Sequence, residues 1–243
     1  MKQRTLTVIN QRQLTEDVFE LKLSGIRGAL ILPGQFVNLR IPNLFLRRPI
    51  SVCDAQEDEL TLVYRVVGAG TAALKEGKED QIDALIELGN GYDLSVSGEQ
   101  PLMIGGGVGI PPLYYLARKL MAQGKQVTAV LGFNRAEEMF YLQEFQELGV
   151  TAIVTTVDGS YGIKGFVTDA LPECYTSFYT CGPIPMMKAI YKKTTENGQF
   201  SLEERMGCGF GACMGCSIQT ADGPKRVCKE GPVFRKEDLQ WDD

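Results

Sequence analysis

The first hundred residues alternate short hydrophobic stretches with turn residues. Within residues 18–23 the charged side chains fall at positions 20 and 22, so hydrophobic side chains recur with the period of a strand. Comparable stretches at residues 6–10, 36–41, 50–54 and 59–67 are separated by glycine, proline and asparagine. Short strands at this density predict a small antiparallel β-barrel, which we assign to residues 1–97.

From residue 98 the pattern changes to longer elements in which strands and helices alternate. A strand at residues 102–104 leads through glycines to a helix at 111–122, whose leucines share one face. The later elements are a strand, a helix, two strands and a helix, at residues 127–131, 137–148, 151–157, 177–180 and from Pro185 onward. This alternation predicts a Rossmann-like parallel sheet over residues 98–200 and a multidomain fold that combines α+β and α/β parts.

The remaining residues, 201–243, are too few to build a hydrophobic core of their own. They contain four cysteines, three in the pattern C-x4-C-x2-C and a fourth after eleven intervening residues: Cys208, Cys213, Cys216 and Cys228. This is the plant-type arrangement for a [2Fe-2S] cluster, in which four thiolates hold two irons. Glycines between the cysteines let the backbone wrap closely and direct its N–H groups at sulfur. We therefore predict a compact cluster domain that metal ligation holds together.

Four cysteines have two other common uses. Disulfides are disfavoured because the chain starts with Met1 and charged residues instead of an apolar secretory segment, which favours a reducing, cytoplasmic location. A structural zinc site is the stronger alternative, although such sites usually take two C-x2-C pairs and only Cys213 and Cys216 form one here.

Composition narrows the chemistry further. The chain has 25 Lys and Arg against 30 Asp and Glu, a formal charge of -5, and no basic stripe that would suit nucleic acid. Glycines and prolines interrupt its richest apolar run, so membrane insertion is not expected either. The absence of histidine from the sequence removes the commonest general base and most catalytic zinc and haem sites. Cofactors are therefore expected to supply the chemistry.

A glycine-rich turn joins the strand at 102–104 to the following helix, and its glycines are Gly105, Gly106, Gly107 and Gly109. Prolines start that helix, whose free amides would favour an approaching phosphate. The turn departs from G-x-G-x-x-G because Pro112 stands where the third glycine belongs. A tight turn that serves packing alone is the alternative.

The barrel offers a second candidate phosphate site. Gly70 and Thr71 precede a short predicted helix at residues 72–76, with Thr71 as its N-cap. Arg48 or Arg65 could neutralise a pyrophosphate there. Taken alone, Arg48 could equally be a surface charge and Ser51 an ordinary strand residue.

The order of these motifs resembles the ferredoxin-NADP reductase superfamily. The motifs are Arg48-Pro49-Ile50-Ser51 and Gly70-Thr71 in the barrel, the glycine turn, Cys181-Gly182-Pro183, and then the four cysteines. Over essentially the whole chain, the sequence looks most like the electron-transfer subunits of the NAD-dependent (class 1B) bacterial dihydroorotate dehydrogenases. Residues 158–162 and 164–169 also fit that family.

The resemblance implies roles for individual residues. FAD would be bound by Arg48, Pro49, Ile50, Ser51, Arg65, Val66, Val67, Gly70 and Thr71. NAD would be bound by Gly105, Gly106, Gly107, Gly109, Cys181, Gly182 and Pro183. Ser51, near flavin N5, and Cys181, near the nicotinamide, are the candidate catalytic residues. The superfamily often has a stacking tyrosine where Ile50 stands, so we expect no aromatic stacking from that position. The metal ligands would be Cys208, Cys213, Cys216 and Cys228.

The resemblance also implies a function. NADH would give a hydride to FAD, and single electrons would then pass through the cluster to FMN on a dihydroorotate dehydrogenase catalytic subunit, in pyrimidine (UMP) biosynthesis. Two such chains would join two catalytic chains in a heterotetramer. Two alternatives are a free-standing NAD(P)H reductase for another acceptor and a zinc-stabilised binding module without redox groups. The residues leave NADH and NADPH open, because Glu137 and Glu138 would repel a 2′-phosphate that Arg135 would attract.

Overall fold

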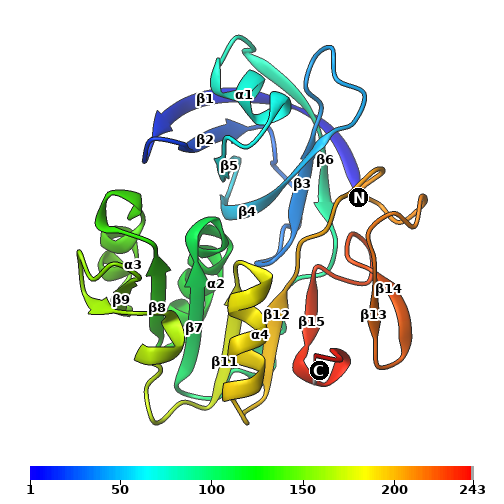
Figure 1. Cartoon of the computed structure of the whole chain (residues 1–243). Coiled ribbons are helices and arrows are strands. Elements are labelled where there is room, and N and C mark those ends of the chain that lie inside the picture. The colour runs from blue at the N-terminus through cyan, green and yellow to red at the C-terminus, as the bar shows by residue number, and fades with distance from the viewer. Residues whose placement is uncertain (242–243) are drawn as a thin grey trace.

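The computed structural model describes residues 1–241 and confirms the predicted barrel, parallel sheet and C-terminal segment (Figure 1). Six antiparallel strands close the barrel in the order β1-β2-β5-β4-β3-β6. Their bounds are β1 (Lys2–Gln13), β2 (Val18–Ser24), β3 (Phe36–Leu39), β4 (Arg48–Gln56), β5 (Glu59–Arg65) and β6 (Gln81–Leu88). Inward-facing side chains such as Leu21, Leu39 and Leu62 fill the barrel and form its core.

The barrel contains one strand that we did not predict. In β6 the buried side chains of Ile82, Ala84 and Ile86 alternate with more exposed neighbours, so the period-two signal was present in the sequence. The strand pairs with β1 on one side and β3 on the other, and it thereby closes the barrel.

The second part is a seven-stranded sheet in the order β10-β9-β8-β7-β11-β12-β15. Its strands are β7 (Pro101–Gly106), β8 (Thr128–Phe133), β9 (Thr151–Thr156), β10 (Ile163–Lys164), β11 (Ser177–Cys181), β12 (Gly198–Ser201) and β15 (Val233–Arg235). All neighbours pair in parallel except β15, which is antiparallel to β12. The parallel topology confirms the predicted Rossmann-like sheet.

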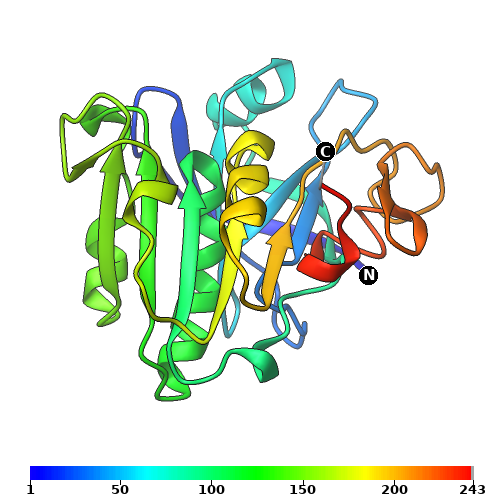
Figure 2. The same ribbon diagram turned by 60° about the horizontal axis from the view of Figure 1, so that its bottom comes forward.

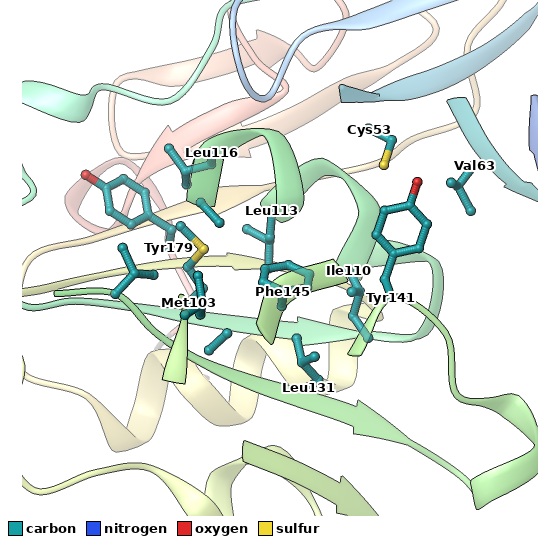
Figure 3. Close-up of a cluster of buried hydrophobic side chains, with 14 of the residues drawn as sticks. Cys53, Val63, Met103, Ile110, Leu113, Leu116, Leu131, Tyr141, Phe145 and Tyr179 are labelled. Atoms are coloured by element: carbon teal, nitrogen blue, oxygen red, sulfur yellow. The ribbon is translucent and has the colours of Figure 1, made fainter. Parts of the chain in front are cut away.

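Helices cover both faces of this sheet. The helices are α2 (Ile110–Ala122), α3 (Leu142–Glu147) and α4 (Ile184–Lys193), and a short helix α1 (Ala69–Lys75) belongs to the barrel. Figure 3 shows α2 side chains such as Leu113 and Leu116 packed with Phe145 of α3 over Met103 of β7. This cluster includes Val63 of the barrel, so α2 and α3 lie between sheet and barrel, whereas α4 packs on the opposite face.

The helix predicted at residues 137–148 was wrong in its extent. A 3-10 turn (Ala136–Glu138) is followed by Tyr141 with a left-handed φ of 66°, and α3 begins only at Leu142. The Tyr141 hydroxyl donates to a Glu20 Oε2 atom of the barrel at 2.7 Å. Tyr141 and Glu20 are 121 positions apart in sequence, so local periodicity could not reveal this contact.

Glu20 is the centre of a polar contact between barrel and sheet. It also accepts a 2.7 Å hydrogen bond from Arg12 Nε, and Arg12 pairs with Glu144 of α3 at 3.2 Å. Burial alone would raise the pKa of Glu20, but the hydrogen bonds from Arg12 and Tyr141 outweigh it and hold the pKa below its usual value. The Tyr141 hydroxyl points towards Cys53 of β4 (Figure 3). These contacts fix the angle at which the barrel meets the sheet.

The C-terminal segment packs against the rest of the chain instead of standing alone. Its strand β15 extends the sheet, and a hairpin of β13 (Ser217–Thr220) and β14 (Gly223–Arg226) lies beside it (Figure 2). Val227, Phe234 and Leu239 share a hydrophobic cluster with the sheet. Packing on the sheet therefore contributes to holding this segment in place, and the expectation that metal ligation holds it together stays a prediction. The predicted domain limits, 1–97, 98–200 and 201–243, stay a prediction.

Within residues 1–241 we find no helix with the length and apolar character needed to cross a membrane.

Candidate functional site

Most of the residues predicted to bind FAD and NAD line one cavity of about 520 Å³ between the barrel and the sheet. The barrel contributes Arg48, Pro49, Ile50, Ser51, Arg65, Val67 and Thr71. The sheet contributes Gly106, Gly107, Gly109, Cys181, Gly182 and Pro183. The predicted residues outside its wall are Val66, Gly70 and Gly105. The cavity lies at the carboxyl ends of β7 and β11, where the strand order changes direction, and ligands usually bind there in open α/β sheets.

The barrel side of this cavity combines a helix start with a cation. Helix α1 begins three residues earlier than predicted, with Gly68 at the N-cap, so Thr71 lies in the first turn. The Thr71 hydroxyl accepts a 3.0 Å hydrogen bond from the Val67 amide and donates to the Gly68 carbonyl. A Cβ atom on Gly70 would lie 2.0 Å from Arg48 Nε, so a larger residue here would displace the guanidinium from its position over this turn. The Arg48 guanidinium and the free backbone amides at the start of α1 can together bind a diphosphate.

On the sheet side, two backbone turns touch each other. The turn after β7 forms a 3-10 element (Gly107–Gly109) before α2, and the turn after β11 contains Gly182. A Cβ atom on Gly109 would lie 2.3 Å from the Cys181 carbonyl oxygen. Gly105 serves packing, because a Cβ atom there would meet Ile110 at 2.8 Å. The glycines therefore let two chain segments meet at the edge of the cavity.

Cys181 and Ser51 line the same cavity, Ser51 from the barrel and Cys181 from the sheet. Burial raises the pKa of Cys181 to about 12, so its thiol is neutral at pH 7. A neutral thiol can contact an uncharged ring without acting as a nucleophile. The catalytic roles of both residues stay predictions.

Sequence reasoning missed part of the binding surface. A second cavity of about 460 Å³ extends along the carboxyl ends of β7, β8 and β9, and meets the first at Gly106, Gly107 and Pro183. Its unpredicted wall includes Gly132, Thr155, Phe166, Val167, Thr168 and Met186. The rule that ligands bind at the carboxyl ends of parallel strands would have pointed to Gly132 and Thr155. Phe166, Val167 and Thr168 lie in the segment 164–169, which fits the family but was given no binding role.

The far end of this second cavity contains an acidic side chain. Glu138 lines the wall, and it accepts hydrogen bonds from Asn134 Nδ2 at 2.8 Å and Arg135 Nε at 3.1 Å. Arg135 and Glu137 are exposed and are not part of this wall. The carboxylate of Glu138, and not the guanidinium of Arg135, therefore lines this cavity.

The four cysteines of the C-terminal segment form two pairs. Cys208 and Cys213 exchange backbone-to-sulfur hydrogen bonds of 3.5 Å, and the Cys228 amide donates to Cys216 Sγ at 3.4 Å. Burial alone would raise the pKa of Cys208, but hydrogen bonds to its sulfur, including one of 3.2 Å from the Ala212 amide, outweigh it and lower the pKa to about 6. Burial, together with the adjacent Cys216, raises the pKa of Cys228 to about 12. The loop stabilises negative charge on sulfur at its Cys208 end.

This pairing fits a binuclear cluster. In a [2Fe-2S] centre each iron takes two thiolates and shares two sulfides, so ligands are needed in pairs. A mononuclear zinc site instead needs its ligands around one point. The pairs Cys208–Cys213 and Cys216–Cys228 therefore fit the iron–sulfur prediction.

Fold and site together define a class of protein, a flavin- and nicotinamide-dependent reductase of the ferredoxin-reductase type with an added iron–sulfur segment. Two family models match the chain. The iron-sulfur cluster binding domain of dihydroorotate dehydrogenase B matches residues 203–240, and the oxidoreductase NAD-binding domain matches residues 103–192.

Relatives of known name cover almost the full length. Electron transfer subunits of dihydroorotate dehydrogenase B (NAD(+)) from Geobacillus sp. (strain WCH70) and Shouchella clausii (strain KSM-K16) are 45% and 43% identical, with 97% and 96% of both chains covered. A solved structure of an NADH-dependent reduced ferredoxin-NADP oxidoreductase is 33% identical with a TM-score of 0.87, over 98% of this chain and 90% of that one. The chain belongs to the family of dihydroorotate dehydrogenase B electron transfer subunits.

Proposed function

We propose that this chain carries electrons between NADH/NAD+ and the FMN of a dihydroorotate dehydrogenase catalytic subunit, in pyrimidine (UMP) biosynthesis. The main support is that the predicted FAD and NAD residues share one cavity, whose wall continues through residues 201–203 towards the cysteines. Glu203 lies five residues before Cys208, a length that spans at most about 18 Å. When bound, FAD exchanges a hydride with nicotinamide and single electrons with a [2Fe-2S] cluster.

The chain's own residues bind and orient these groups. Arg48 and the first turn of α1 bind the FAD pyrophosphate, and Ser51 lies at the flavin side of the cavity. The glycine turn and the backbone at Cys181 position the nicotinamide against the flavin. Cys208, Cys213, Cys216 and Cys228 hold the cluster, and backbone amides stabilise its charge.

The partner is an FMN-containing dihydroorotate dehydrogenase catalytic subunit, in an assembly of two chains of each kind. The cluster loop suits a partner surface, because Phe210 and Met214 are 44% and 52% exposed beside the cysteine ligands. We place the complex in the cytoplasm, since free thiolates for metal binding suit a reducing compartment.

Co-expression with an FMN-containing dihydroorotate dehydrogenase catalytic subunit tests the proposal. We expect the chains to purify together, to contain flavin, iron and acid-labile sulfide, and to reduce NAD+ with dihydroorotate. Native mass measurement should give two chains of each kind. A brown-yellow protein that oxidises NADH with ferricyanide yet neither associates nor confers NAD-linked activity would point to a reductase for another acceptor. A colourless protein with one zinc would point to a binding module.

The same site predicts a preference for NADH. The Glu138 carboxylate would repel a 2′-phosphate, while its ion pair with Arg135 weakens that residue as a phosphate ligand. In the Glu138→Gln variant we expect the ratio of kcat/KM for NADPH to that for NADH to rise about ten-fold, equivalent to about 1.4 kcal/mol. Steady-state reduction of ferricyanide measures both values. Glu137→Gln is the matched control, because Glu137 is exposed outside the cavity, and an equal rise in both variants would contradict the assignment.

A further inference from the structure

Asn38 of β3 touches the backbone of a predicted cluster ligand. Its side chain is 1% exposed, and its Nδ2 atom donates a 3.2 Å hydrogen bond to the Cys208 carbonyl oxygen. The two residues are 170 positions apart, so this bond joins the barrel to the cluster loop. We did not predict a role for Asn38 from the sequence.

The position of Asn38 in the barrel also connects it to the cavity. In the β3–β4 pair, Asn38 lies directly opposite Pro49, which lines the cavity on its flavin side. Side chains opposite each other in an antiparallel pair share one face of the sheet, with Cβ atoms about 4.5–5.5 Å apart. The Asn38 side chain therefore lies between the Cys208 backbone and the wall of the cavity.

The cluster loop is shaped to accept this contact. Gly209 has a φ of +76°, and a Cβ atom there would lie 2.4 Å from Asn38 Nδ2. A glycine at this position lets the loop approach the carboxamide closely.

The Asn38 carboxamide is only partly hydrogen-bonded, whereas a stable core favours a hydrogen bond for every buried polar atom. Because the Cys208 carbonyl is an acceptor, the amide nitrogen must face it. Within residues 1–241, the Oδ1 atom of Asn38 is buried and makes no hydrogen bond. An unpaired buried acceptor lowers stability, so an apolar residue of the same size would suit the core as well. Stability alone therefore does not account for asparagine here.

We propose that Asn38 is a positioning residue that sets the separation and orientation between the cluster and the flavin. This inference rests on the proposed function. In the step concerned, one electron lost by NADH-reduced FAD is gained by a ferric iron of the cluster, and no bond forms or breaks. The rate of such a step falls exponentially with separation, so the hydrogen bond that joins this loop to the barrel controls the rate through distance. The bond to the Cys208 peptide also sets the direction of that dipole at the cluster.

Two variants test this from opposite sides of the contact. Asn38→Leu keeps the size of the side chain and removes the donor, and Gly209→Ala pushes the loop away from Asn38. In both we expect iron content to be retained and NADH reduction of FAD to stay within about two-fold. Rapid mixing with NADH should show bleaching of cluster absorbance slowed about ten-fold or more, in line with the cost of an ångström-scale displacement. The reduced cluster should also show a changed EPR spectrum and midpoint potential.

Gly223→Ala is the matched control. Gly223 lies in the same segment with a φ of +97°, but a Cβ atom there meets nothing within 4 Å. It should keep the wild-type transfer rate and EPR spectrum despite similar backbone strain. Wild-type transfer rates and spectra in both test variants would overturn the role of Asn38 while leaving the proposed function intact. Absence of iron and sulfide from the unaltered chain would overturn both.

Discussion

Replacement of Cys213 by serine is expected to abolish electron delivery through the cluster while leaving the oxidation of NADH intact. Cys213 is an exposed member of the Cys208–Cys213 pair, and a serine oxygen is a poorer ligand for iron than a thiolate. The variant should lose iron, acid-labile sulfide and the EPR signal of the reduced cluster. Dihydroorotate-dependent reduction of NAD+ by the assembled complex should fall by about 100-fold or more, since losing a ligand should cost at least as much as losing one of its hydrogen-bonding partners.

The cavity proposed to bind FAD and NAD has none of the four cluster cysteines in its wall, so NADH-dependent reduction of ferricyanide should stay within about two-fold of wild type. Cys174→Ser is the matched control, because Cys174 is exposed and lies outside the cluster segment. It should retain iron and both activities. If Cys213→Ser delivered electrons to the catalytic subunit as fast as the unaltered chain, the order of the relay would be wrong.

Replacement of Gly109 by alanine is expected to abolish the use of NADH. The new methyl group would lie 2.3 Å from the Cys181 carbonyl oxygen, and neither atom belongs to a flexible side chain. The two backbone turns would have to separate, which displaces the nicotinamide from the flavin. Because a displacement of 1 Å in a reacting pair costs about 100-fold, we expect kcat/KM for NADH to fall by at least about 100-fold.

Stopped-flow reduction of FAD by NADH measures this effect directly, and flavin absorbance reports whether FAD is still bound. Gly124→Ala serves as the control, since Gly124 follows α2 at a φ of +78° and a Cβ atom there would meet nothing within 4 Å. That substitution strains the backbone without moving the turns, so it should lower stability and leave kcat/KM unchanged. A Gly109→Ala variant with wild-type flavin reduction would show that contact between the turns is dispensable.

Local signals in the sequence accounted for much of the fold. The prolines after the glycine turn located the start of α2 to within one residue, and alternation located β2. The same alternation exists in β6 and was overlooked. The start of α3 could not be predicted, because Tyr141 adopts a left-handed conformation and bonds to Glu20 across the interface with the barrel. Such long-range contacts override local periodicity.

The candidate site likewise contains some residues that local sequence signals indicate and others that they do not. Residues that belong to compact motifs, such as Arg48, Gly109 and Cys208, could be proposed as candidates from their neighbours in sequence. Thr155 and Phe166 reach the second cavity only because parallel strands end at one edge of the sheet. Asn38 has no motif around it, and its bond to the Cys208 carbonyl depends on how the C-terminal segment folds back onto the barrel.

The pairing of β15 with β12 has a consequence for biogenesis. Residues 233–235 follow all four cluster ligands, yet they complete the sheet that begins at residue 101. While the polypeptide emerges from the ribosome, β12 must expose an unpaired edge until the cysteine-bearing stretch has been synthesised. Open edges invite pairing with other chains, so a nascent chain arrested or cleaved near residue 205 should aggregate. Completion of the nucleotide sheet is thus tied to synthesis of the metal-binding part.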